Sequence, residues 1–189
     1  MDATHGPALV YLAGIGNSGP GHWQAIWHAR VPGGLWVEHS SWDAPVRDVW
    51  VREFDQALRA VEGPVILVAH SLGCTLVTEW AAQHKNDDMA GAFLVAVPDV
   101  HGPDFPAQAV GFDAPKHRRL PFRTVVVASD DDPYGSPGHT AEVAAAIGAE
   151  LVPIGRKGHI NADSGLGDWP EGWALLTGSF PGFTGAFPG

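Results

Sequence analysis

The chain has 189 residues, of which 45% are hydrophobic and 17% are charged, a composition typical of globular proteins and unlike that of disordered or collagen-like ones. It carries 11 Lys and Arg against 21 Asp and Glu, and this formal charge of -10 without a basic cluster argues against nucleic acid as a partner. No apolar run approaches the roughly 18 residues of a membrane span. A lone cysteine, Cys74, excludes an intramolecular disulfide.

Residues 1–7 have no basic residue before the first apolar run, so they lack the layout of a secretory signal. We therefore expect one domain over residues 1–189, located in the cytoplasm and without a membrane partner.

Uninterrupted apolar runs predict strands that are buried on both faces of a parallel sheet. A further strand near the sheet edge is expected at residues 33–39. The runs occupy residues 8–13, 65–69, 91–97, 123–128 and 151–154.

Helical periods separate these strands. Apolar residues recur at spacings of three and four in residues 46–61 and 72–80, and residues 137–147 form a third helical segment. Ser136 is a predicted N-cap and Gly148 a predicted terminator of that third helix, while Trp23 and Trp27 would share a helical face. Strands that alternate with helices predict an α/β fold with a mostly parallel central sheet and helices on both faces.

The segment VILVAHSLGC, residues 65–74, predicts a nucleophile elbow. Ser71 lies at the turn between a buried strand and a helix, and small residues, Ala69 and Gly73, stand two positions before and after it. Such a turn holds the serine hydroxyl above the sheet, beside the amides of a helix N-terminus. The alternative is an ordinary N-cap serine.

A serine nucleophile needs a base and a carboxylate that orients the base. In this fold the chain order is serine, acid, histidine, which Asp132 and His159 satisfy, because each follows a predicted strand. Both would therefore lie at the carboxyl edge of the sheet, where ligands bind. Chain order alone does not identify the acid, because Asp99, Asp130 and Asp131 are also candidates.

An oxyanion hole needs two backbone N–H groups. One is expected from Leu72, after the serine, and the other from Ile15 or Gly16, in the glycine-rich loop after the first strand. That loop does not match the spacing of phosphate-binding motifs. Candidate substrate contacts are Asn17, His70 and Trp42. The alternative for His70 is a role in packing or in shaping the pocket, and the alternative for Trp42 is packing in the core.

The last ten residues, FPGFTGAFPG at about 180–189, cannot form a regular helix. They are expected either to lie loosely on the domain, or to cover an apolar groove or a neighbouring subunit with Phe180, Phe183 and Phe187.

Taken together, several motifs give the chain a resemblance to a known family. It resembles the small α/β-hydrolases similar to retinoblastoma-binding protein 9 and to bacterial proteins of the YdeN type, along nearly its whole length. The motifs are LAG at 12–14 with Ser18, HWQ at 22–24, WDAP at 42–45, AHSLG at 69–73, VPDV at 97–100, DDPY at 131–134, GHIN at 158–161 and SGLGDW at 164–169.

This resemblance implies a hydrolase without a large cap domain, whose acid is the aspartate before Pro133, which is Asp132. Ala69 replaces the usual elbow glycine, and the apolar tail is not part of the family pattern. Human members of the family also have a protein-binding role, but no residue here identifies a binding motif for such a partner.

We expect a serine hydrolase that cleaves a small ester, thioester or amide through an acyl-serine intermediate, with no metal or other cofactor. Two alternatives are an acyltransferase and a catalytically silent binding module of the same fold. The sequence favours the enzyme, because nucleophile, base and acid are all present. It specifies neither the substrate nor the oligomeric state.

Overall fold

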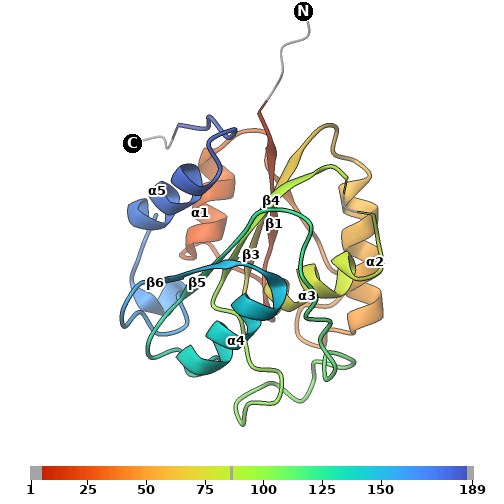
Figure 1. The fold of residues 1–189 in the computed structure, drawn as a ribbon, viewed down its shortest axis with the longest axis vertical. Helices are drawn as coiled ribbons and strands as arrows, with labels where there is room; N and C mark the ends of the chain where they lie inside the picture. The colour runs from red at the N-terminus through yellow and green to blue at the C-terminus, as the bar shows by residue number, and fades with distance from the viewer. Residues whose placement is uncertain (1–5, 86, 187–189) are drawn as a thin grey trace, which may run out of the picture.

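The computed structural model describes residues 6–85 and 87–186. Within these residues, six strands form one fully parallel sheet, ordered β2-β1-β3-β4-β5-β6 (Figure 1). This confirms the predicted parallel sheet, including its short edge strand. The strands are β1 (Ala8–Leu12), β2 (Leu35–Trp36), β3 (Val65–His70), β4 (Met89–Val95), β5 (Thr124–Ala128) and β6 (Glu150–Pro153).

Helices cover both faces of the sheet, as Figure 1 shows. Strand side chains alternate between the two faces, so in β1 Leu9 and Tyr11 join one core and Val10 and Leu12 the other. One face is covered by α1 (Trp23–Arg30) and α5 (Pro170–Ser179), and the other by α2 (Arg47–Leu58), α3 (Leu72–Ala81) and α4 (Pro137–Ile147). A short 3-10 helix, η1 (Ala162–Ser164), precedes α5.

The predicted boundaries of α4 are confirmed. The Ser136 side chain accepts a hydrogen bond from the His139 amide, and Gly148 ends the helix in the left-handed conformation at φ 73°. Helix α5 was not predicted, because glycines interrupt its sequence. Gly172 allows a close approach there: a Cβ at this position would lie 2.2 Å from the Trp169 ring.

The beginning of the apolar tail packs on the domain. Phe180 is 4% exposed and lies against Gly91 of β4, and the ring centroid of Phe183 is 5.7 Å from that of Trp173. These two residues therefore extend the core under α5. The third tail phenylalanine, Phe187, lies outside the described residues.

The long connection between β4 and β5, residues 96–123, crosses the carboxyl end of the sheet, at the bottom of Figure 1. Its described residues contain no helix. Within the connection, Val110 forms an isolated β-bridge with Val46, which precedes α2. The Lys116 amide also donates to the buried Glu79 carboxylate of α3 at 2.9 Å. These contacts hold the connection against α2 and α3.

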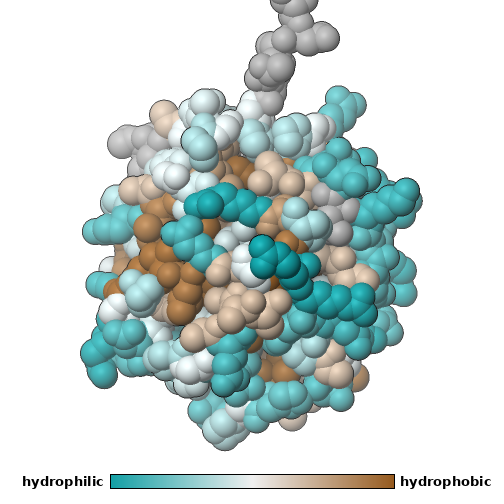
Figure 2. Space-filling model, in the orientation of Figure 1, coloured by the Kyte–Doolittle hydropathy of each residue, from teal (hydrophilic) through white to brown (hydrophobic). Residues whose placement is uncertain are grey.

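The surface in this view is largely hydrophilic, and hydrophobic residues gather on its left side, beside β6 and α5 (Figure 2). Val152 of β6 and Leu175 of α5, together with Ile154 just after β6, are partly buried against the core. Among the described helices, none is both long and apolar enough to cross a membrane.

Candidate active site

Ser71 lies between β3 and α3 in a strained backbone conformation, with φ 54° and ψ -126°. Two glycines make room for this turn. A Cβ on Gly73 would lie 2.3 Å from the Leu12 carbonyl oxygen, and one on Gly14 would lie 2.8 Å from the Ser71 Cβ. The β3–α3 turn therefore packs directly against the end of β1, with the serine side chain at the carboxyl edge of the sheet.

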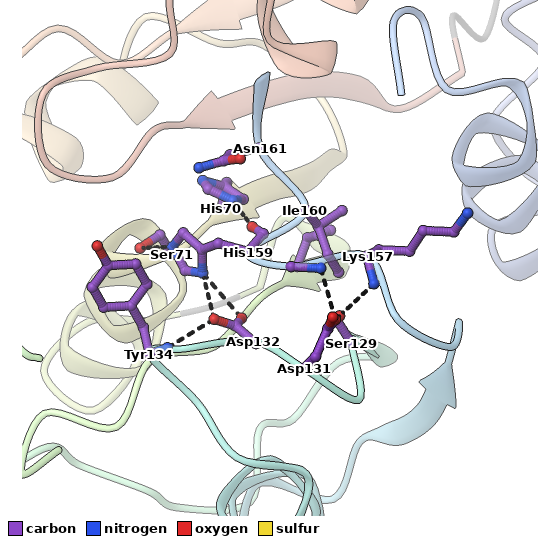
Figure 3. Close-up of polar contacts among 12 residues, drawn as sticks. His70, Ser71, Ser129, Asp131, Asp132, Tyr134, Lys157, His159, Ile160 and Asn161 are labelled. Carbon is purple, nitrogen blue, oxygen red and sulfur yellow. Dashed lines mark hydrogen bonds and ion pairs between the residues drawn. The ribbon is translucent and has the colours of Figure 1, made fainter. Parts of the chain in front are cut away.

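The structure brings Ser71, His159 and Asp132 into one chain of hydrogen bonds (Figure 3). His159 Nε2 is 2.9 Å from Ser71 Oγ, and His159 Nδ1 is 2.9 Å and 3.0 Å from the two carboxylate oxygens of Asp132. The carboxylate favours a proton on Nδ1, which leaves Nε2 to accept from the serine hydroxyl. This is the hydrogen-bonding pattern of an activated serine.

Burial strengthens this arrangement. The side chains of His159 and Asp132 are 10% and 2% exposed, so water competes little for their hydrogen bonds. Asp132 Oδ1 also accepts from the Tyr134 amide at 2.9 Å, and the Tyr134 ring lies 4.6 Å from the His159 ring. The carboxylate and the imidazole are therefore both held in place from the same loop.

The rival acids lie elsewhere. Asp131 Oδ1 accepts from the Gly158 amide at 2.8 Å and from Ser129 Oγ at 2.9 Å, and these hydrogen bonds, led by that of Gly158, lower the pKa of Asp131. Asp99 accepts from the His101 amide, and Asp130 is exposed. Asp132 is therefore the aspartate that contacts His159.

Asp131 joins two loops, which we call the acid loop, residues 129–136, and the base loop, residues 154–161. Asp131 accepts a hydrogen bond from the Gly158 amide, and Ser129 Oγ accepts a second one from the Lys157 amide at 2.8 Å (Figure 3). The acid loop follows β5 and the base loop follows β6, which are neighbouring strands. These bonds fix the separation of Asp132 and His159.

Two buried rings hold the base loop from the opposite side. His70 Nε2 donates to the His159 carbonyl at 2.9 Å, and Trp23 Nε1 donates to the Ile160 carbonyl at 2.8 Å. Burial keeps the pKa of His70 well below its usual value, so this imidazole is neutral and carries its proton on Nε2. His70 is therefore a neighbour of the base rather than a second base.

The candidate oxyanion amides differ in their partners. Leu72 is the first residue of α3, so its N–H has no partner within the helix, and both Leu72 and Ile15 line the pocket. The Gly16 amide instead donates to the Trp42 carbonyl at 3.0 Å. Leu72 and Ile15 are therefore the better candidates, and Gly16 is already engaged.

A cavity of about 320 Å³ opens over Ser71. Its apolar and aromatic wall consists of Ile15, Leu72, Pro98, Phe105, Pro106, Tyr134 and Ala162. Polar lining comes from Asn17, His22, His70 and Asn161, together with Ser71 and His159.

Of the three expected substrate contacts, Asn17 and His70 line this cavity. Trp42 does not belong to the described lining, and its ring packs 5.0 Å from His39 and 5.7 Å from Trp50. Trp42 acts on the site through its backbone, whose carbonyl accepts from Gly16.

Sequence reasoning missed several residues that line the cavity, among them His22, Phe105 and Tyr134. His22 is the N-cap of α1 and stood within the HWQ motif, and Tyr134 stood within DDPY, so both carried a signal. Burial, followed by the nearby His159, lowers the pKa of His22 to about 4. Phe105 lies in the irregular connection 96–123, where no motif marks it.

Comparisons with known proteins identify the family of the chain. The model of a family described as serine hydrolase matches residues 9–178. A YdeN-like hydrolase from Pectobacterium atrosepticum superposes with a TM-score of 0.82 at 28% identity, covering 93% of this chain and 91% of that one. No curated protein matches the sequence significantly.

Two more distant structures share the fold. The ydeN gene product from B. subtilis has a TM-score of 0.78 at 20% identity, covering 93% of this chain and 99% of that one. An esterase from Thermogutta terrifontis has a TM-score of 0.67 at 16% identity, covering 95% and 92%. The chain thus has the α/β-hydrolase fold, with no cap domain in its described residues, and it belongs to the serine hydrolase family, close to hydrolases of the YdeN type.

Proposed function

We propose that the protein hydrolyses a small ester, thioester or amide through an acyl-enzyme intermediate on Ser71. The observation that carries this proposal is the unbroken hydrogen-bond chain from Ser71 Oγ through both nitrogens of His159 to Asp132. That chain lies at the floor of a cavity large enough for a small acyl group.

In the first half-reaction, Ser71 Oγ attacks the acyl carbon while His159 Nε2 takes the hydroxyl proton. The carbonyl oxygen becomes an oxyanion, which the N–H groups of Leu72 and Ile15 stabilise. His159 then returns the proton to the leaving alcohol, thiol or amine, and the acyl group stays on Ser71.

In the second half-reaction, His159 takes a proton from water, whose oxygen attacks the acyl carbon. Collapse of this intermediate releases the carboxylic acid and returns the proton to Ser71. Throughout, Asp132 stabilises the imidazolium form of His159 and stays ionised. The positive end of helix α3 behind Leu72 favours both oxyanions.

Labelling with a fluorophosphonate probe tests the proposal, because the probe reacts with activated serines. We expect the wild type to be labelled at Ser71, Ser71→Ala to be unlabelled, and His159→Ala to be labelled at least about 100-fold more slowly. Ser136→Ala, which removes a serine at the N-cap of α4, is the matched control and should be labelled like the wild type. A folded wild type that resists the probe would contradict the proposal.

A further inference from the structure

The described lining of the cavity contains no aspartate, glutamate, lysine or arginine side chain. Its fifteen residues are two glycines, six apolar residues, one tyrosine, one serine, two asparagines and three histidines. Of these histidines, His22 and His70 are buried, with the pKa of His22 lowered to about 4 and that of His70 held well below its usual value. A charged group on a substrate would therefore lose its hydration here and meet no carboxylate, ammonium or guanidinium group among the described lining residues.

The charged residues next to the lining residues in the chain are acidic. Every charged residue that directly precedes or follows a lining residue in the chain is an aspartate: Asp99, Asp104 and Asp163. The whole chain carries a formal charge of -10. This net charge repels an approaching anion and attracts a cation before either loses its water.

We propose that the site selects uncharged acyl groups, with cationic acyl groups second and anionic ones last. This inference rests on the proposed function, because it describes the cavity over the same serine. Loss of hydration penalises both kinds of ion, and repulsion from the negative net charge of the chain penalises the anion further. The same reasoning makes phosphate-bearing thioesters, such as those of coenzyme A, poor substrates.

Para-substituted phenylboronic acids test this order, because boron binds the serine oxygen reversibly and the substituent alone changes. The methyl compound is neutral, the aminomethyl compound cationic and the carboxy compound anionic. We expect the inhibition constant to rise about tenfold from methyl to aminomethyl and again severalfold to carboxy. Raising the salt from about 0.02 to about 0.5 M should bring the two ions closer together and leave the methyl compound ahead.

A lining variant and a thioester pair complete the test. Ala162→Lys places a cation in the lining, so the ratio of the carboxy to the methyl inhibition constant should fall at least about threefold. Butyryl-N-acetylcysteamine should be hydrolysed at least about tenfold faster than butyryl-coenzyme A, which carries the same acyl group.

The outcomes separate this inference from the proposed function. If the carboxy compound inhibits the wild type as well as the methyl compound does, the charge selection is wrong while the serine hydrolase stands. If no boronic acid binds more tightly to the wild type than to Ser71→Ala, and the fluorophosphonate also fails to label, then the proposed function itself falls.

Discussion

Two adjacent aspartates at this site have different partners. Asp132 contacts the His159 imidazole, whereas Asp131 accepts from the Gly158 amide and from Ser129 Oγ. We expect Asp132→Asn to lower kcat for a small ester by about 10³ to 10⁴, because an amide favours the wrong imidazole tautomer.

Asp131→Asn is the matched control for that substitution. Its Oδ1 can still accept from Gly158, so we expect it to keep kcat within about tenfold of the wild type. Steady-state kinetics on both variants, with their melting temperatures, make the comparison. Equal losses in the two variants would mean that the contact with His159 does not identify the acid.

His70 provides a second test at the scale of one side chain. Its Nε2 donates to the carbonyl of His159 itself, so it positions the base without touching the serine proton. His70→Gln can place an amide N–H near the same point, whereas His70→Leu cannot. We expect His70→Leu to lower kcat by about 10 to 100-fold with little change in KM, and His70→Gln to restore most of it.

A purely structural role for His70 would give another pattern. The melting temperatures of the two variants would then differ in step with their activities, and kcat at a temperature where both are fully folded would be alike. That pattern would rule out positioning through the hydrogen bond.

Helix α3 can approach β1 because its second residue is glycine. A Cβ on Gly73 would lie 2.3 Å from the Leu12 carbonyl oxygen, so Gly73→Ala must push helix and strand apart. We expect it to lower the free energy of unfolding by at least about 2 kcal/mol. Gly138→Ala on α4, where a Cβ would have no neighbour closer than Ser136 Oγ at 4.0 Å, should instead raise it by about 0.5 kcal/mol. Urea denaturation measures the free energy of unfolding of both variants. Similar free energies for the two variants would contradict this expectation.

The sequence predicted those elements whose local signals agree with their packing. The buried strands and the capped helix α4 could be predicted, because apolar runs and cap residues are local properties of the sequence. The elbow and the chain order led to Ser71 and His159 for the same reason, and the family resemblance selected Asp132. The elements that were missed depend on contacts between distant parts of the chain.

Helix α5 shows why such elements are missed. Its glycines disfavour a helix locally, but Gly172 packs on Trp169 and Trp173 on the ring of Trp27, 5.0 Å away. Phe105 lines the cavity from the irregular connection 96–123, which also contains the bridge between Val110 and Val46, and no sequence motif predicts either contact. In both cases tertiary packing decides the outcome.

For the whole molecule, buried histidines make stability depend on pH. The pKa of His22 is about 4 in the folded chain and about 6.5 when unfolded, so between these values the unfolded state binds more protons. Stability therefore rises with pH across this window and is lost as the pH falls from 6.5 towards 4. The contribution of His22 amounts to about 3 kcal/mol.

His22→Asn tests this linkage and keeps an N-cap acceptor for the Gln24 amide. We expect its free energy of unfolding to fall less steeply than that of the wild type between pH 6.5 and 4. A residual slope should remain, because burial lowers the pKa values of His70 and His39 too. Identical slopes in denaturant titrations would show that His22 is already protonated in the folded chain.

The hydrogen bonds between the acid loop and the base loop allow the separation of these loops to be followed by hydrogen exchange. The amides of Lys157 and Gly158 lie in a loop, where backbone protons normally exchange with deuterium quickly, yet both donate to side chains of the other loop. Their exchange rates therefore follow the separation of the two loops. A mass-spectrometric time course over these residues would show, without any substrate, how often the catalytic geometry comes apart.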